Sequence, residues 1–299
     1  YTPHAQRMVT LALLTELLVI GLFLGAFYGL IAIGLSLVFG VQNVINLAHG
    51  EFVMLGAYAA FYGWALLSLS PIVSLVLSLP LLFAFGVFLQ WLLLERINDK
   101  TELASLILTF GLALSLRNLA QFVFSANYRS IDYLTESVSI LGANVSLNRP
   151  LGFGVAIAVA AAFFLFLRYS DWGKAIRATS QNPAIAKACG INTSHVRMVS
   201  FGLGAATAGA AGGIAGMLYT IYPYMGLQYL LKSFVVVVIG GLGSLVGAAI
   251  GGIGFGVVES IATYQLSSNE ATMIAFVLLV VMLLVRPQGL FGRSDAGGE

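Results

Sequence analysis

Charged side chains are scarce in this sequence. Only 9% of its 299 residues are charged, whereas soluble domains carry roughly 25%, and 59% are hydrophobic. Apolar runs of about 20 residues recur along the chain, which is the length of helix that crosses a hydrocarbon core of about 30 Å. A membrane β-barrel is disfavoured, because its strands would read as alternations of roughly ten residues. The sequence therefore predicts an all-α integral membrane protein in contact with the lipid bilayer.

Cysteine and histidine are also few. The one cysteine, Cys189, excludes an intrachain disulfide and has no Cys or His neighbour at zinc-ligand spacing. His4, His49 and His195 are too scattered for a local metal site, so we expect no metal. The "GKA" of residues 173–175 lacks the Ser or Thr and the upstream glycines of a phosphate-binding loop. No catalytic arrangement is evident, and we predict that the chain is not an enzyme and carries no cofactor of its own.

Hydropathy and helix breakers divide the chain into eight expected membrane spans within a single transmembrane domain, residues 1–299. The expected spans are 17–39, 51–69, 72–94, 103–124, 151–167, 199–221, 231–263 and 270–285. The first apolar block, 17–39, exceeds the roughly 7 to 15 apolar residues of a secretory signal, so we interpret it as a membrane helix.

The connector 168–198 carries five basic residues and one acidic residue, five minus one, or a net charge of +4. The positive-inside rule places it in the cytoplasm, and 169–198 is the expected cytoplasmic coupling loop. Arg7, Arg286 and Arg293 favour cytoplasmic termini more weakly. Five spans would then precede the loop and three would follow it. A chain that starts and ends on the same side of the membrane must cross it an even number of times. Five and three crossings are both odd, so they conflict with a cytoplasmic loop and two cytoplasmic termini.

Two stretches are longer than the crossings assigned to them. Residues 231–263 would extend about 50 Å and are interrupted by "GGLGS" at 240–244, while 17–69 would extend about 80 Å and are interrupted by "GVQNVINLAHGEF" at 40–52. Breaks at corresponding positions are typical of inverted-repeat transporters whose path lies at the midplane. We therefore expect a broken or re-entrant segment in each half. The alternative is an extracellular N-terminus. It would account for the five spans before the loop but not for the three spans after it.

Residues in or near these breaks are the candidates for a solute path, because non-helical backbone at membrane depth occurs only where protein or a water-filled cavity satisfies its polar groups. The candidates are Asn43, Asn46, His49, Glu51, Gly240, Gly241, Gly243 and Glu259. The polar side chains of the first break could contact a solute or brace two helix ends, and both interpretations stay open.

Ionisable groups in or near spans are costly in lipid and face partners or cavities. Besides Glu51 these are Arg117, Lys232 and Glu259. Lys232 could snorkel to an interface, whereas Glu259 is the better candidate for a lumen-facing or helix-pairing group. Glycines four apart, as in Gly252 and Gly256, predict close helix packing.

Within the basic loop, Asn182 and Pro183 predict a turn that opens a short helix, 184–189, stopped by Gly190. The "QNPA" of residues 181–184 occurs once and in a basic loop, so it does not indicate a water or glycerol channel.

Several stretches resemble the permease subunits of branched-chain amino acid ABC importers, of the LivH type. The most specific is "GLIAIGLSLVFGVQNVINLAHGEFVMLGAY" at 29–58. The others follow in order: "TELASLILTFGLALSLRNLAQFVFSANYRS" at 101–130, "GKAIRATSQNPAIAKACGIN" at 173–192, "VVIGGLGSLVGAAIGG" at 237–252 and "RPQGLFG" at 286–292.

This resemblance implies a multi-pass permease of a bacterial or archaeal cytoplasmic (inner) membrane that forms half of a translocation path. The implied partners are a homologous second permease, two cytoplasmic ATPase subunits that hold ATP and Mg, and a periplasmic or lipid-anchored solute-binding protein; no nucleic acid is expected. The "AKACG" of 186–190 resembles the element that seats in a groove of the ATPase, although the acidic residue that usually opens it is absent. The implied coupling residues are Arg177, Gln181, Ala186, Lys187 and Gly190.

The resemblance further implies that closure of the ATPase pair moves the short loop helices and alternates the access of the path. Leucine, with a zwitterionic head and an apolar tail, would suit Asn43 and Asn46 beside an aliphatic wall. A permease for urea or short amides, an ion-coupled secondary transporter and a passive channel are the rival hypotheses. The lack of a regular Asp, Glu and His chain disfavours a proton-coupled carrier.

Overall fold

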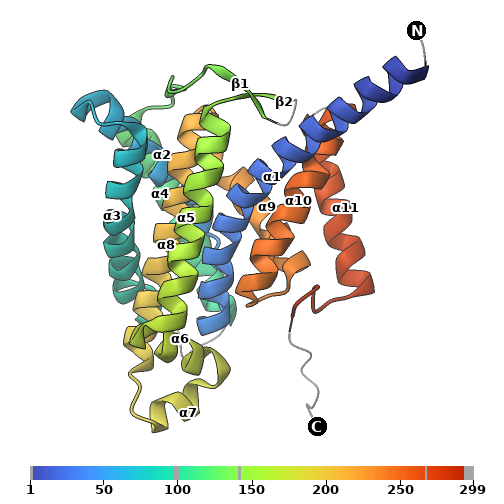
Figure 1. The fold of residues 1–299 in the computed structure, drawn as a ribbon. Coiled ribbons are helices and arrows are strands. Elements are labelled where there is room, and N and C mark those ends of the chain that lie inside the picture. The colour runs from blue at the N-terminus through green and yellow to red at the C-terminus, as the bar shows by residue number, and fades with distance from the viewer. Residues whose placement is uncertain (1–2, 97–101, 141–142, 267, 293–299) are drawn as a thin grey trace.

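The computed structural model describes residues 3–96, 102–140, 143–266 and 268–292. These residues form an all-α bundle, as predicted (Figure 1). The helices are α1 Pro3–Gln42, α2 His49–Leu67, α3 Pro71–Leu92, η1 Leu94–Arg96, α4 Glu102–Phe124, α5 Asn148–Tyr169, α6 Asp171–Gln181, α7 Pro183–Ala188, α8 Thr193–Leu218, α9 Met225–Gly240, α10 Leu245–Gln265 and α11 Ser268–Val285. A two-stranded antiparallel hairpin, β1 Ser137–Ile140 and β2 Ala143–Ser146, lies between α4 and α5 and was not expected.

Among the described residues, seven helices are long and apolar enough to cross a membrane: α1, α2, α3 with η1, α4, α5, α8 and α10. The shorter apolar helices α9 and α11 complete the bundle. The predicted spans 51–69, 72–94, 103–124 and 151–167 match α2 to α5 within three residues at each end. Seventeen of the 26 residues of α8 are buried, so this helix forms the centre of the bundle.

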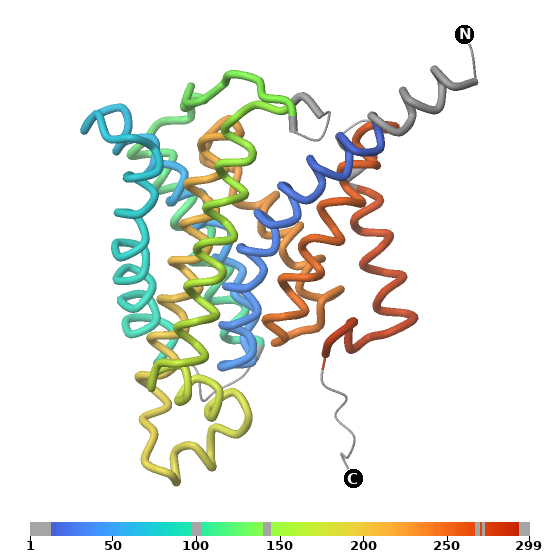
Figure 2. Tube along the Cα trace, viewed as in Figure 1, coloured from blue at the N-terminus to red at the C-terminus, as the bar shows by residue number. Residues whose placement is uncertain are grey.

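The course of α1 determines the topology. Near its end, the Gln42 side-chain amide donates to the carbonyl of Arg197 in the first turn of α8 (3.3 Å), which is the end of the bundle that carries α6 and α7. Its first described turns lie at the opposite end (Figure 2). The positive charge of the loop predicts that it lies in the cytoplasm, and on that orientation α1 begins on the outer side. The expectations drawn from Arg7 and from the basic loop conflict, because the two lie at opposite ends of the bundle, and the alternative of an extracellular N-terminus fits the more strongly charged loop.

This orientation removes the parity conflict. Five helices, α1 to α5, precede the loop and lead from the outer to the inner end, while four helices, α8 to α11, follow it and return the chain to the inner end. Residues after α11 pack on the inner turn between α9 and α10, where the Leu290 amide donates to the carbonyl of Ile239 (2.8 Å). The cytoplasmic side expected after the last span agrees with this position.

The first break is present where the sequence predicts it. The chain leaves α1 at Asn43, whose φ of 52° is left-handed, and α2 begins at His49 beside the middle of α1. His49 Nε2 lies 3.0 Å from the carbonyl oxygen of Ile31. Because Ile31 precedes the end of α1 by about 16 Å of helix, residues 43–48 return into the bundle before α2 starts. This is a re-entrant segment.

The second predicted break is different in kind. The helices on either side of Gly240–Ser244 run antiparallel, since Gly240 packs on Gly247 and Gly251 packs on the carbonyl of Val236. Gly241 and Gly243 take φ values of 104° and 78°, which side chains rarely adopt. The break expected at 240–244 is therefore present, but as a turn and not as a re-entrant segment. "GGLGS" is the tight inner turn of a helical hairpin.

A second re-entrant segment does exist, at 219–224 between α8 and α9. Gly216, near the end of α8, lies beside Ala57 of α2, whereas Gly226 in the first turn of α9 lies beside Gly50. Gly50 precedes Ala57 by about 10 Å of helix, so the chain returns by that distance before α9 starts. Each half thus has one re-entrant segment, the first approached from the inner end and the second from the outer end.

Glycines make the closest helix contacts, as predicted. Gly25 and Gly29 of α1 meet Gly252 and Gly256 of α10 backbone to backbone, where an added methyl group would overlap main-chain atoms. Without water inside the bilayer to drive association, such close packing supplies the attraction between helices. The peripheral α4 packs mainly on α2 and leaves large apolar side chains exposed, among them Leu103 and Phe122.

Candidate functional site

The first re-entrant segment buries most of its polar side chains. Asn46, His49 and Glu51 are 1%, 0% and 1% exposed. The Asn46 side-chain oxygen accepts from the amide of Ala48 (3.0 Å), and the Asn46 carbonyl accepts from the amide of His49 (3.2 Å). With His49 against the Ile31 carbonyl, these groups satisfy the backbone at the start of α2. The geometry agrees with the bracing interpretation for Asn46 and His49.

Glu51 holds an ion pair between α2 and α4. Its Oε1 lies 2.5 Å from a guanidinium nitrogen of Arg117, and the guanidinium also lies over the ring of Tyr224, 5.6 Å from its centroid. Glu51 stands in the first turn of α2, where the helix dipole favours a negative charge. Its Oε2 faces the first turn of α9 at Gly226. The sequence singles out both ionisable residues, and the structure pairs them.

A second ion pair joins α9 to α10. Lys232 Nζ lies 2.5 Å from Glu259 Oε1 and donates to the hydroxyl oxygen of Tyr28 (3.0 Å), while the Tyr28 hydroxyl donates to Glu259 (3.2 Å). Three helices, α1, α9 and α10, meet at this triad. Lys232 does more than snorkel to an interface, since its side chain is only 18% exposed and its ammonium is held by two partners. Glu259 is the helix-pairing group expected of it.

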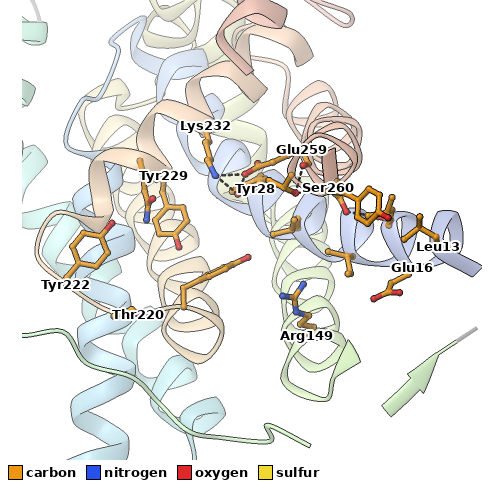
Figure 3. A pocket seen from close by; sticks show the side chains of 17 residues that line it. Leu13, Glu16, Tyr28, Arg149, Thr220, Tyr222, Tyr229, Lys232, Glu259 and Ser260 are labelled. Atoms are coloured by element: carbon orange, nitrogen blue, oxygen red, sulfur yellow. Dashed lines mark hydrogen bonds and ion pairs between the residues drawn. The ribbon is translucent and has the colours of Figure 1, made fainter. Parts of the chain in front are cut away.

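The triad stands in a cavity of about 650 Å³ in the outer half of the bundle, which we call the outer cavity (Figure 3). Four of its seventeen lining residues are aliphatic, and the other thirteen carry a polar side-chain atom. Five of the chain's twelve tyrosines lie here: Tyr28, Tyr219, Tyr222, Tyr229 and Tyr264. Glu16 and Arg149 lie across from the triad. Glu259 therefore faces a lumen as well as pairing two helices.

A cavity of about 580 Å³, here the inner cavity, lies at the end of the bundle that carries α6 and α7. It is lined by the end of α1 with Asn43 and by the α9–α10 turn with Gly243, together with Ser180 of α6. A methyl group on Gly40 would come 3.4 Å from the Cα of Gly243, so the two interruptions foreseen from the sequence do meet. Of the candidate path residues, Asn43 and Gly243 border this cavity.

Gly240 and Gly241, which precede Gly243, pack against neighbouring backbone and do not border either cavity. Gly240 lies against Gly247, and Gly241 lies against the backbone at Gly292. Neither lines the inner or the outer cavity. Together with buried Asn46, His49 and Glu51, they pack the helices around the two cavities and do not line them.

The basic loop projects from the inner end as α6 and α7 (Figure 1). Asn182 opens α7, because its side-chain oxygen accepts from the amides of Ala184 and Ile185 (3.0 Å each). Gly190, with φ 86°, follows the helix end. The short helix predicted at 184–189 is thus confirmed as 183–188. In the same loop Lys174 lies 2.8 Å from Asp171, and its hydrogen bond lowers the pKa of that carboxyl.

The expected coupling residues fall into two groups. Gln181, Lys187 and Gly190 are exposed, whereas Ala186 is 3% exposed and packs inside the loop. The exposed Arg177 donates to the carbonyl of Leu167 and so ties α6 to the end of α5. Ile185, which the sequence analysis did not select, is 61% exposed on α7. The loop is also fixed at its far end, where Arg197 forms an ion pair with Glu95 of η1.

The outer cavity is the part of the candidate site that sequence reasoning missed. Its residues come from α1, α5, α9, α10 and the second re-entrant segment. Lys232 and Tyr28 are 204 positions apart, and Tyr28 and Glu259 are 231 apart. The sequence did single out Lys232 and Glu259, and tyrosines are enriched around 219–229, but neither signal indicates that these residues share a cavity.

A helical bundle with opposed re-entrant segments, buried ion pairs and a cavity at each end defines a transmembrane permease. The chain belongs to the family described as the permease component of branched-chain amino acid transport systems, whose family model matches residues 17–285. It is therefore a membrane transport subunit and a multi-pass protein of the cytoplasmic membrane.

Named relatives agree with this assignment. The chain is 31% identical over 294 residues to LivH, a high-affinity branched-chain amino acid transport system permease of Escherichia coli K12, covering 92% of this chain and 94% of that one. It is 32% identical to the corresponding permease BraD of Pseudomonas aeruginosa, covering 93% and 95%. The probable permease LivH of Methanocaldococcus jannaschii is 29% identical, covering 88% of each chain. The resemblance found in the sequence is confirmed.

Proposed function

We propose that this chain is the permease subunit of an ATP-driven ABC importer for branched-chain or other neutral amino acids. It would form half of the translocation path, with a homologous second permease as the other half. The family match along 17–285 carries the proposal. Relatives from two bacteria bear names of branched-chain amino acid transport permeases, which supports this class of solute.

Coupling to ATP is assigned to α6 and α7. We infer that two cytoplasmic ATPase subunits hold ATP and Mg and receive α7 in a surface groove. Support comes from the exposure of α7, where Ile185 and Lys187 point away from the bundle and Ala186 alone is buried. Gln181 and Gly190 lie at the ends of the same exposed surface. Arg177 acts behind it, because its bond to Leu167 transmits a push on α6 into α5.

The same push reaches two further helices. The ion pair of Arg197 with Glu95 links the base of the loop to the end of α3, and Gln42 of α1 bonds both to Gln90 of α3 and to the carbonyl of Arg197 (3.3 Å each). A movement of α6 and α7 is therefore transmitted to α1, α3, α5 and α8 together. A periplasmic or lipid-anchored binding protein would deliver the solute at the opposite, outer end.

Uptake into proteoliposomes tests the proposal. The chain is reconstituted with its partner permease, ATPases and binding protein, and uptake of leucine, isoleucine, valine, alanine and urea is measured with and without ATP. The expected result is ATP-dependent uptake of neutral amino acids that stops when the ATPases are omitted. ATP-dependent uptake of urea alone would overturn the solute class. Uptake by this chain alone along an ion gradient would overturn the ABC mechanism.

Coupling is tested by co-purification with the ATPases. Ile185→Asp and Lys187→Glu alter the exposed face of α7 and should each reduce the amount of ATPase recovered, and removal of 186–190 should abolish it. Lys174→Glu, on the exposed face of α6, is the matched control for charge reversal. Normal recovery of the ATPases with the deleted chain would refute the assignment of this loop.

A further inference from the structure

Two charged residues of the outer cavity have no ion-pair partner among the described residues. Glu16 of α1 and Arg149, in the first turn of α5, both line the cavity, and neither forms an ion pair or side-chain hydrogen bond with the residues that the structure describes. Figure 3 shows both side chains directed across the cavity from the triad. Lys232 and Glu259, by contrast, are engaged with each other. The cavity therefore offers one free carboxylate and one free guanidinium.

The charges of the cavity sum to zero. Glu16 and Glu259 are balanced by Arg149 and Lys232. A solute with a net charge would upset this balance in surroundings where charge is costly, whereas a zwitterion keeps it. Guanidinium groups bind carboxylates with paired hydrogen bonds, and a carboxylate accepts from an ammonium. The free pair thus complements the two ends of an α-amino acid.

The wall next to these charges is apolar. Leu13, Leu17, Ile20 and Leu24 of α1 line the cavity on the side from which Glu16 projects. A branched aliphatic side chain would be removed from water against this wall, at about 25 cal/mol for each Å² of apolar surface buried. The cavity volume of about 650 Å³ lies within the usual range of small-molecule sites and leaves room for water.

The second re-entrant segment forms another side of the cavity. Tyr219, Thr220 and Tyr222 line it, and they belong to the non-helical stretch 219–224. Irregular backbone at membrane depth is tolerated where it lines a water-filled cavity. The irregular segment and the polar lining of the cavity therefore favour a water-filled chamber over a lipid-filled crevice.

We propose that the outer cavity is an internal binding site for a zwitterionic aliphatic amino acid, with Arg149 holding its carboxylate, Glu16 its ammonium and the leucine-rich face of α1 its side chain. This site rests on the proposed function. It adds to that function the place at which this chain itself recognises the solute. The same head-group chemistry occurs in phosphatidylethanolamine. The free amino acid is favoured because only four of the seventeen lining residues are aliphatic, which suits one short side chain and not two acyl chains.

Protection of a cysteine reporter tests the site. The full chain with Cys189→Ser and Thr220→Cys is placed in vesicles of phosphatidylcholine and phosphatidylglycerol, and labelling of the reporter by a membrane-impermeant methanethiosulfonate is timed. Leucine should slow the labelling. Leucinamide, which lacks the carboxylate, and 4-methylpentanoate, which lacks the ammonium, should each need about tenfold or more higher concentration, because each loses a charge-assisted hydrogen bond.

Variants assign the two ends of the solute. Arg149→Gln and Glu16→Gln should raise the half-protecting concentration of leucine by about tenfold or more. Arg149→Lys and Glu16→Asp should recover most of the protection, and Arg96→Gln at the inner end is the matched control. The comparison of leucine with its two analogues needs no substitution at the site, so it tests the proposal even if a variant does not fold.

Three outcomes would overturn the proposal: no protection by leucine, equal protection by leucine and both analogues, or protection that Arg149→Gln and Glu16→Gln leave unchanged. A lipid head-group site would appear as slow labelling in vesicles that contain phosphatidylethanolamine, with no further effect of leucine, and would overturn it as well. The test needs no ATPase. Failure here with normal ATP-dependent uptake refutes this site alone, and loss of uptake with intact protection refutes the proposed function alone.

Discussion

Removing the carboxylate of Glu51 gives a quantitative test of how α4 is held. Glu51 and Arg117 are 1% and 12% exposed and form the ion pair between α2 and α4. Glu51→Gln leaves the guanidinium buried without its counter-charge, which costs about 3–5 kcal/mol. Because α4 packs mainly on α2, the cost falls on local separation of α4 rather than on the whole bundle.

A reporter on α4 measures this separation. Ala113, 4% exposed on α4, is changed to cysteine in a Cys189→Ser background, and its labelling rate under native conditions follows the open fraction. A loss of about 3–5 kcal/mol corresponds to labelling roughly 100- to 4,000-fold faster. Adding Arg117→Met to Glu51→Gln removes the unpaired charge and should return the rate most of the way.

The exposed ion pair of Lys174 with Asp171 is the control, and Lys174→Gln should leave the labelling of position 113 unchanged. Two results would refute the reasoning. Glu51→Gln could label at the unsubstituted rate, which would mean that the pair does not hold α4. Alternatively, the double variant could label as fast as Glu51→Gln, which would mean that the carboxylate acts through something other than Arg117.

Three further substitutions test the backbone geometry. Gly50→Ala places a methyl group against the carbonyl of Gly226 and should cost about 1–3 kcal/mol, lowering the thermal midpoint, whereas Gly111→Ala meets nothing within 4 Å and should not. Asn182→Ala removes the cap of α7 at a cost of about 1 kcal/mol, which hydrogen exchange in α7 would register. Gly241→Ala strains a φ of 104° and should lower the midpoint more than Gly111→Ala does; an equal midpoint would contradict this.

Local signals in the sequence were sufficient for the spans and for the short loop helix. Apolar runs delimit α2 to α5 to within three residues, and Asn182 with Pro183 marks the start of α7. The helix boundaries and the start of α7 are both determined by residues only a few positions apart in the sequence. The first re-entrant segment was also readable, because polar residues interrupt a run that is too long for its crossings.

Long-range arrangement was not readable in the same way. The glycines of 240–244 signal a turn and a re-entrant segment equally well, and antiparallel contacts of Gly240 with Gly247 decide between them. The second re-entrant segment, 219–224, contains Pro223, which predicts an interruption between helices but not the return of the chain into the bundle. Glu51 and Arg117 were each recognised as costly in lipid, but their pairing across 66 positions is a property of the packed helices.

The contact of Gly50 with Gly226 gives α9 the mechanics of a lever. The helix is held at its first turn by α2, borders the outer cavity with Gln228, Tyr229 and Lys232, and ends at the turn that borders the inner cavity. Its 16 residues span about 24 Å, so a tilt of about 10° at the held end moves the far end about 4 Å. A small adjustment around an occupant of the outer cavity is therefore magnified at the inner one.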